Sequence, residues 1–301
     1  MSDSIEFANY KKTEIYKKNL TINELEKLSI FLSGIFKKSL NFQLKKSFSV
    51  EFLNWLYNEN PNGKEIINNI YKDEKIIAHF ALVPITVLFN NKTYRSALSV
   101  FNAVDENHRN LYIFHQLASK SFELAELEDV RFIMSVANET SSELYVKCFK
   151  FKLISPLTVK IGFSKFQEKN NSPHKFEILR DKTTLEWRLK NPRFKYQIFK
   201  ENEKHTIYNN NYKLFKMNMG YISNKDLDLQ NNIISNDTYN LNPFNMWIGL
   251  NNNLKKTKIS FNFPNILKPS PCNFIIKDLK SEETNLSKKD IKFNLIDYEV
   301  F

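Results

Sequence analysis

The chain has 301 residues, of which 42% are hydrophobic and 14% aromatic, and its formal net charge is +11. This hydrophobic content excludes an intrinsically disordered chain, and the length allows one large domain or two of ordinary size. The two cysteines and five histidines lack metal-ligand spacing, which excludes a disulfide framework and predicts no metal site.

The positive charge has two interpretations. One is an anionic partner, such as nucleic acid, a membrane surface or a phosphate-bearing cofactor. The other is composition, because lysine and asparagine are frequent throughout the chain and form no dense basic block. We expect a modest anion site and no nucleic-acid partner. The first residues lack the apolar core of a signal peptide, and the longest apolar run, Ile76–Phe89, contains His79 and Pro84 and is too short to span a bilayer. A cytoplasmic protein without a transmembrane segment is therefore expected.

Two helices are predicted near the start of the chain. Thr21 and Glu24 have the spacing of a capping box, and apolar residues follow at helical period. A second helix, SVEFLNWLYNEN, ends at Asn60-Pro61, because proline disfavours helical geometry in the residue before it.

Strands and helices then alternate. EIINNIY and KIIAHFALVPITVLF flank a turn at 72–75, and KTYRSALSVFNAV gives a third strand. NLYIFHQLASKSFELAELE is a long amphipathic helix, RFIMSVA a buried strand, 138–149 a further helix and KLISPLTVKIGF a closing strand. The order α-α-β-β-β-α-β-α-β predicts a mixed α/β domain over residues 1–165.

The second half repeats a piece of the first. WLYNENPNGKEIINNIYKDEKII and WRLKNPRFKYQIFKENEKHTI each place a tryptophan-bearing helix that ends in Asn-Pro before a strand hairpin. Thr183 and Glu186 suggest a capping box for the second of these helices. An internal duplication is favoured over a chance match, with halves 1–165 and 166–301. Because 224–247 is weakly patterned, the second half is expected to lack a cofactor segment and to serve as a scaffold or as a wall of the acceptor pocket.

The run NHRNLYIFHQL, residues 107–117, links the third strand to the long helix. A strand, a short polar turn and a helix often hold a phosphate group on the free N–H groups at the helix start. Such turns usually contain glycine, and this one has none. Three interpretations stay open: a phosphate site built without glycine, a decayed site, or only a turn.

The order of elements in residues 22–163 resembles that of the GCN5-related N-acetyltransferases, the GNAT superfamily. In that family the strand before the turn ends in V-x-P-x-Y-R-G-x-G-I, followed later by a buried strand, an asparagine, a helix and Gly-Phe. The positions that agree here are Val104, the aromatic-like His108, Arg109, Ile113, Phe114, Asn138 and Phe151. The positions that depart from the pattern are Glu106 in place of proline, and Asn110, Tyr112 and Lys150 in place of glycine. The tandem layout is similar, more narrowly, to bacterial GNAT-like proteins associated with surface-polysaccharide synthesis.

The resemblance implies a mostly antiparallel sheet flanked by helices, a degenerate second half, and acetyl-CoA or another acyl-CoA as co-substrate. The residues that it assigns to the cofactor are Asn102, Ala103, Val104, Arg109, Asn110, Leu111, Tyr112, Ile113 and Asn138. Amides before the turn would donate to the thioester carbonyl, and Arg109 with the helix start would hold the pyrophosphate. Asn138 either bonds cofactor amides or caps its own helix.

Acyl transfer to an amine needs a proton acceptor and a proton donor for the leaving thiolate. The family's tyrosine donor maps to Tyr145, which otherwise reads as an ordinary helix residue. Asp105 is a candidate base and equally fits turn chemistry, while Glu51 and His79 are alternatives. His79 also fits a satisfied core histidine. Trp55 either shapes the acceptor pocket or packs in the core.

We therefore expect an acyl-CoA-dependent N-acyltransferase that acts on a primary amine, such as a nucleotide-linked or lipid-linked amino sugar of a surface glycan. The alternative is a GNAT-shaped binding or scaffold protein without catalysis, which the lost glycines favour. The sequence sets neither the acceptor nor the oligomeric state.

Overall fold

The computed structural model describes thirteen stretches of the chain. They are residues 11–15, 19–36, 48–109, 111–163, 165–168, 174–201, 204–209, 215–223, 244–251, 254–255, 260–263, 271–281 and 285–298. The chain forms two compact units: Met1–Ile85 with Arg95–Ile133, and Thr86–Tyr94 with Met134–Phe301. The predicted domains, 1–165 and 166–301, stay a prediction.

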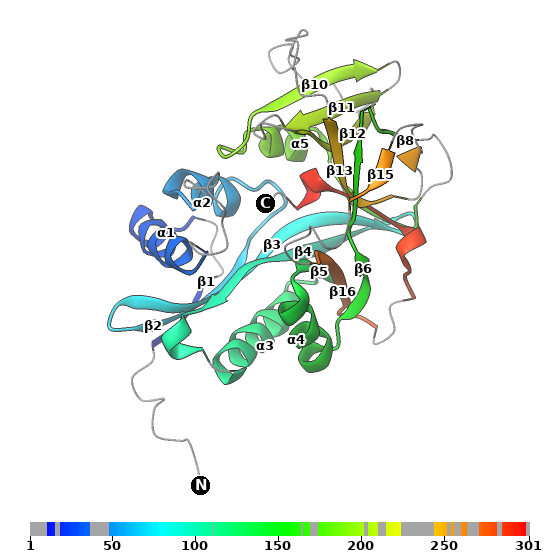
Figure 1. The fold of residues 1–301 in the computed structure, drawn as a ribbon. Helices are drawn as coiled ribbons and strands as arrows, with labels where there is room; N and C mark the ends of the chain where they lie inside the picture. The colour runs from blue at the N-terminus through cyan, green and yellow to red at the C-terminus, as the bar shows by residue number, and fades with distance from the viewer. Residues whose placement is uncertain are drawn as a thin grey trace. The chain divides into compact units, whose positions relative to one another are not determined.

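From α1 to α4 the element order is the predicted one, whereas β1 comes before the predicted elements and the predicted closing strand is divided into β6 and β7 (Figure 1). The elements are β1 (Lys11–Ile15), α1 (Ile22–Phe36), α2 (Val50–Tyr57), β2 (Ile66–Lys72), β3 (Lys75–Phe89), β4 (Lys92–Val104), α3 (Leu111–Leu127), β5 (Phe132–Ala137), α4 (Glu139–Phe149), β6 (Lys152–Pro156) and β7 (Thr158–Gly162). The mixed α/β fold with a large, mostly antiparallel sheet and flanking helices is thus confirmed. None of the described helices is both long and apolar enough to cross a membrane.

In the first unit, helices cover both faces of the hairpin β2–β3. Asn68 of β2 donates to Ser121 of α3 at 2.8 Å, and its strand partner Phe80 packs against Phe122 of α3. The next residue, Asn69, points to the opposite face, as alternation along a strand requires. There its partner His79 meets Tyr57 of α2. The alternation places α3 on one face of the hairpin and α2 on the other.

The later elements belong to the second unit. They are β8 (Gln167–Glu168), β9 (Phe176–Leu179), α5 (Lys182–Leu189), β10 (Tyr196–Glu201), β11 (Lys204–Asn209), β12 (Phe215–Ser223), β13 (Phe244–Leu250), β14 (Leu254–Lys255), β15 (Ser260–Asn262), β16 (Asn273–Asp278) and β17 (Ile291–Asn294), with a 3-10 turn η6 at Leu295–Asp297. β10, β11 and β12 pair antiparallel, and β12 pairs parallel with β13. Most of the weakly patterned stretch 224–247 lies outside the described residues.

The Asn-Pro turns of the two proposed halves are built alike. Asn60 is fully buried, and its side-chain oxygen accepts from the backbone N–H of Asn62 at 3.0 Å. Asn191 is also buried, and its side-chain oxygen accepts from the N–H of Arg193 at 3.0 Å. The predicted capping box of α5 is wrong, because the helix begins at Lys182 and its N-cap is Asp181. Asp181 accepts the N–H of Thr184, which leaves Thr183 inside the first turn.

Two strands of the second unit pair with partners that are distant in sequence. β6 pairs antiparallel with β16, a strand from late in the chain. β7 follows β6 after only Leu157, yet it pairs with β13 and β15. Between β6 and β7, the Leu157 N–H donates to the carbonyl of Cys272, the residue before β16, at 2.8 Å. These pairings of distant strands were not predicted from the sequence.

Candidate active site

The strand before the turn carries a backbone irregularity. Phe101 of β4 has φ +54, a left-handed conformation that is rare for a bulky residue. Beside it, the Asn102 side chain accepts from the Ala81 N–H at 2.8 Å and donates to Ser99 Oγ at 2.6 Å. The Asn102 side-chain oxygen thus accepts the β3 N–H that a backbone carbonyl of β4 would otherwise accept. Nothing in the sequence marked this irregularity.

The Phe101 ring is fixed by an aromatic cluster of the first unit. Its centroid lies 4.9 Å from that of Phe48 and 5.9 Å from that of Phe52, with the rings nearly perpendicular. Trp55 stacks on Phe52 at 5.6 Å and is only 3% exposed. Such packing supplies both apolar burial and favourable ring geometry. Of the two interpretations of Trp55, the structure supports core packing.

After Asn102, Ala103 and Val104 are buried and complete β4. Asp105 then caps a short 3-10 turn, accepting from the Asn107 N–H at 2.9 Å, and its carboxylate lies 3.2 Å from His108 Nδ1. Partial burial favours a raised pKa for Asp105, but the hydrogen bonds from Asn107 and the neighbouring His108 outweigh it and lower the pKa. A carboxylate with a lowered pKa is a weaker proton acceptor.

The start of α3 faces solvent. Arg109 is exposed, and Asn110 lies outside the described residues. Leu111 and Tyr112 are 57% and 52% exposed, while Ile113 is buried. The Tyr112 hydroxyl accepts from Gln116 Nε2 at 2.7 Å, one turn further along the helix. The phenol therefore lies along the helix surface. The exposed Arg109 and the positive end of the α3 dipole favour an anion at this end of the helix.

Asn138 and Tyr145 belong to the second unit. Asn138 is the N-cap of α4 and accepts from the Ser141 N–H at 2.8 Å, which is the capping interpretation. Tyr145 is 3% exposed, and its ring centroid lies 4.9 Å from that of Phe151 and 6.0 Å from that of Phe149. The assignment of Tyr145 as proton donor stays a prediction, as does the cofactor set around Arg109.

Lys150 ends α4 in the conformation that the resemblance reserves for glycine. Its φ and ψ are 58° and 34°, the left-handed region in which glycine pays no steric penalty. The alignment with the family pattern thus identifies a real backbone requirement at position 150.

His79 is a satisfied core residue. Its Nδ1 lies 2.7 Å from the Asn69 side-chain oxygen, which can only accept, so Nδ1 carries the proton and Nε2 accepts from the Tyr57 hydroxyl at 3.2 Å. Burial lowers the pKa of His79 to about 3 and, together with the Glu65 charge, raises the pKa of Tyr57. His79 stays neutral at physiological pH, and both ring nitrogens are engaged.

Comparison with known proteins gives structural matches alone. No protein-family model matches the chain, and no curated protein matches it. A conserved protein of unknown function from Enterococcus faecalis V583, described as a probable N-acyltransferase, matches with a TM-score of 0.56 and 11% identity over 90% of this chain and 73% of its own. A GCN5-related N-acetyltransferase from Anabaena variabilis matches with a TM-score of 0.54 and 11% identity over 89% and 73%. A candidate acetyltransferase from Pyrococcus horikoshii matches with a TM-score of 0.50 and 12% identity over 94% of each chain.

The chain has the GNAT fold. Identities this low establish the fold alone, because one fold supports many activities. Within this GNAT fold, the first unit holds the strand β4, the turn and the exposed start of α3. The second unit holds Asn138 and Tyr145. Among the described residues, no group of three or more His, Cys, Asp or Glu side chains is arranged to hold a metal ion.

Proposed function

We propose that this protein is an acyl-CoA-dependent N-acyltransferase. The observation that carries the proposal is a strand with a left-handed residue, Phe101, that runs through a polar turn into the exposed start of the 17-residue helix α3. This arrangement occurs in a fold shared with proteins described as N-acetyltransferases. The residues fit an acyl-CoA, since Arg109 and Leu111 at the start of α3 are exposed and the Tyr112 hydroxyl bonds Gln116 one turn along the helix.

In this proposal the chain's own groups bind the acyl-CoA and orient its thioester, and the bound thioester supplies the activated acyl group. Arg109, Leu111, Tyr112 and Ile113 line the diphosphate, with Arg109 giving a charge-assisted contact and the helix start its positive dipole end, neither of which depends on glycine. Asn110 belongs to the same proposed set. Backbone N–H groups from Asn102 to Val104 donate to the thioester carbonyl, where negative charge develops during attack.

The proton transfers of the proposal involve Asp105 and Tyr145. Asp105 accepts the amine proton only weakly, given its lowered pKa. Tyr145 as proton donor requires the thiolate to reach a side chain that is 3% exposed. These two observations favour the second candidate, a GNAT-shaped protein that binds acyl-CoA or another ligand without turnover.

The finer parts of the proposal rest on the resemblance alone. They are acetyl-CoA as the acyl donor, an amino sugar of a surface polysaccharide as the acceptor, and a place in the cytoplasm. Asn138 is a further proposed contact to the cofactor's amides, in addition to its role as the cap of α4.

A ligand-induced shift in thermal stability tests the proposal. At a concentration 100-fold above its dissociation constant, acetyl-CoA should stabilise the native chain by about 2.7 kcal/mol. Arg109→Ala should weaken binding about tenfold, as expected for loss of one charge-assisted contact. Lys147→Ala, which removes an exposed cation on α4, is the matched control and should bind normally.

Release of free coenzyme A thiol in the presence of amines separates the two candidates. Thiol release that depends on an amine supports the enzyme. Binding without release supports the inactive protein. A chain that ignores acetyl-CoA at millimolar concentration contradicts the proposed cofactor site.

A further inference from the structure

The parallel strands β12 and β13 form a fork in the second unit. They pair from Phe215–Phe244 to Asn218–Trp247, and beyond that row no pairing joins their described residues. β7 pairs with β13 on one side as far as Gly249. β17 also pairs with Gly249, through Asn294. Because a strand has two edges and β7 occupies one, β17 must lie on the edge that faces β12. The segment 291–298 therefore enters the fork.

Two glycines admit this segment. A Cβ on Gly249 would collide with the Phe293 carbonyl oxygen and lie 2.9 Å from the Trp247 ring, closer than packed atoms tolerate. Gly220 of β12 has φ +148, and a Cβ there would lie 3.2 Å from Asn294 Cβ and 3.3 Å from Ile296 Cγ2. Each arm of the fork thus has a glycine where the inserted segment comes closest.

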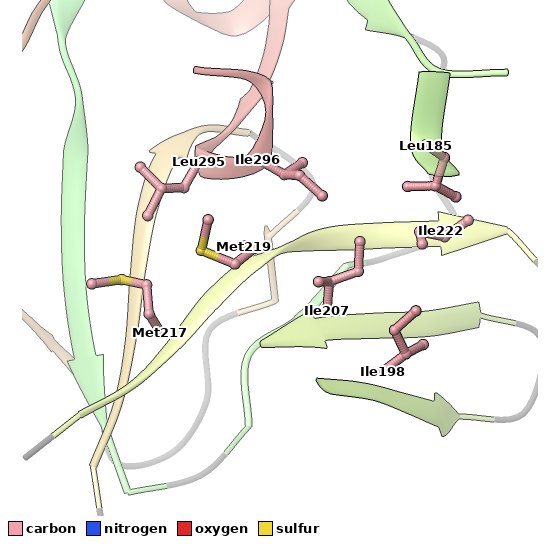
Figure 2. Close-up of a cluster of buried hydrophobic side chains, with 8 residues drawn as sticks. All are labelled: Leu185, Ile198, Ile207, Met217, Met219, Ile222, Leu295 and Ile296. Carbon is pink, nitrogen blue, oxygen red and sulfur yellow. The ribbon is translucent and has the colours of Figure 1, made fainter. Parts of the chain in front are cut away.

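Apolar side chains fix the segment against β12. Leu295 and Ile296 belong to the same buried cluster as Met217, Met219 and Ile222, and Figure 2 shows the η6 turn seated over β12. Ile296 is fully buried and Leu295 is 4% exposed. Full burial of two such side chains is a substantial contribution to the stability of a domain.

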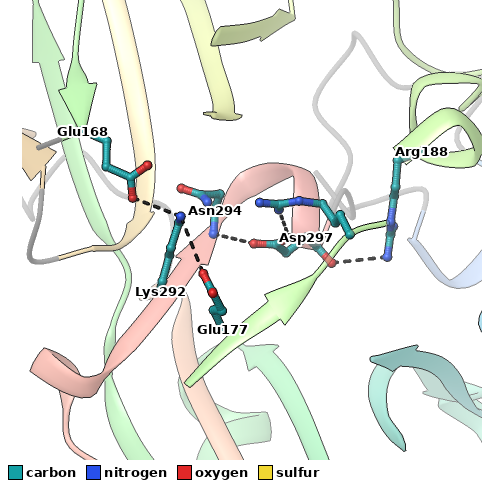
Figure 3. A network of polar contacts seen from close by, with 7 residues as sticks. Glu168, Glu177, Arg188, Lys292, Asn294 and Asp297 are labelled. Atoms are coloured by element: carbon teal, nitrogen blue, oxygen red, sulfur yellow. Dashed lines mark hydrogen bonds and ion pairs between the residues drawn. The ribbon is translucent and has the colours of Figure 1, made fainter. Parts of the chain in front are cut away.

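Polar contacts hold both ends of the segment (Figure 3). Before the fork, Lys292 Nζ lies 3.1 Å from a Glu168 carboxylate oxygen. Within it, Asp297 pairs with Arg180 and accepts from the Asn294 N–H at 2.7 Å, while Arg188 donates to the Asp297 carbonyl at 3.4 Å.

Beyond the fork, the Tyr298 hydroxyl donates to the Val136 carbonyl of β5 at 2.9 Å. Burial raises the pKa of Tyr298 to about 12, so the hydroxyl keeps its proton and remains a donor. The segment is thereby anchored before, within and beyond the fork.

We propose that residues 291–298 fill the fork between β12 and β13, so that the chain binds one acyl-CoA and not two. Diverging parallel strands leave backbone N–H and C=O groups free, and these groups must find partners. At the end of β4 the proposed function gives backbone N–H groups to acyl-CoA. In the fork of β12 and β13, β17 pairs with Gly249 and Leu250 of β13, and η6 packs its apolar side chains against β12. The inference that the chain binds one acyl-CoA rests on the proposed function, whereas the inference that residues 291–298 fill the fork does not.

Hydrogen–deuterium exchange on the full chain tests the filled fork without any ligand. Peptides covering 291–298 should exchange at least about 100-fold more slowly than the same peptides after unfolding. Gly249→Ala should accelerate exchange in these peptides about tenfold or more, because the added methyl displaces the Phe293 carbonyl. Gly34→Ala is the matched control, since a Cβ there meets nothing within 4 Å.

Fast exchange in peptides from α1 would show that the Gly249→Ala chain is globally unfolded. If it is, the protection of residues 291–298 in the unmodified chain tests the filled fork. Unprotected 291–298 peptides, or a folded Gly249→Ala chain with unchanged exchange, would overturn the filled fork.

Calorimetric titration with coenzyme A gives the number of sites. One site per chain supports the inference, and two sites overturn it. Absence of binding together with protected 291–298 peptides contradicts the proposed function alone and leaves the filled fork standing.

Discussion

The strands β4 and β12 follow the same order of elements, but the structure beyond their ends differs. Each strand follows an antiparallel hairpin that is preceded by a helix ending in Asn-Pro. β4 continues through Asp105 into an exposed turn and the start of α3. β12 instead packs against Leu295 and Ile296 from the C-terminal segment. The difference teaches that an element order repeated within a chain does not repeat a binding site, because a distant segment can take the backbone groups that a ligand would use.

The largest expected effect comes from ending the chain at residue 165, the predicted boundary of the first half. The shortened chain keeps β6 and lacks β16, in which Phe274, Ile275 and Ile276 are fully buried. Their burial is worth about 5–9 kcal/mol, comparable to the stability of a whole domain. We expect no cooperative thermal transition by circular dichroism. A native-like cooperative transition would mean that the first half folds without β16.

The carboxylates of Asp297 and Asp105 allow the ends of the two strands to be compared by single substitutions. Asp297 beside the fork is 2% exposed and pairs with Arg180. Asp297→Asn should destabilise the chain by about 3–5 kcal/mol, because it leaves a nearly buried arginine unpaired. Asp105, at the end of β4, is 31% exposed beside His108, so Asp105→Asn should cost less than about 1 kcal/mol. Urea unfolding of both variants measures the difference, and equal costs would contradict the contrast between a filled and an open strand end.

Acid should affect the first unit through His79. Its pKa of about 3 in the folded chain lies below the ordinary 6.5, so the unfolded chain binds the proton first as pH falls. The stability contributed by neutral His79 is present above pH 6.5 and is lost as pH falls toward 3. Between pH 6.5 and 5 the loss should be about 2 kcal/mol. Urea unfolding of the unmodified chain and of His79→Gln at both pH values isolates this contribution. An equal pH dependence in the two chains would show that His79 does not titrate as inferred.

The smallest effect concerns the end of α4. Lys150→Gly should stabilise the chain by under about 1 kcal/mol, because relief of the left-handed strain exceeds the added chain entropy. Lys147→Gly is the matched control, since Lys147 lies inside α4, and this change should destabilise the chain by about 1 kcal/mol. Thermal melts of the two variants give the sign of each change. A loss of stability in Lys150→Gly would mean that the lysine side chain contributes more than its backbone costs.

The local signals of the sequence were reliable wherever neighbouring residues set the structure. The Thr21–Glu24 capping box is present, with the Thr21 N–H donating to Glu24 Oε2 at 2.7 Å. The hairpin turn at 72–75 is confirmed, and both of its central residues have positive φ. At α5 a stronger local competitor won, because Asp181 lies one turn before the Thr184 N–H and caps the helix in place of Thr183. The candidate site was predicted as a segment, since a strand, a turn and a helix are contiguous in the chain.

The sequence by itself determined the helices, the hairpins and the order of elements, because capping, alternation and proline act over a few residues. Only the tertiary structure decided that Phe101 adopts a left-handed conformation, that His79 is neutral between Asn69 and Tyr57, and that the C-terminal segment occupies the fork. These features depend on contacts between residues far apart in the chain. Burial and steric closeness at such contacts outweigh local preference, and the pattern of neighbouring residues does not encode them.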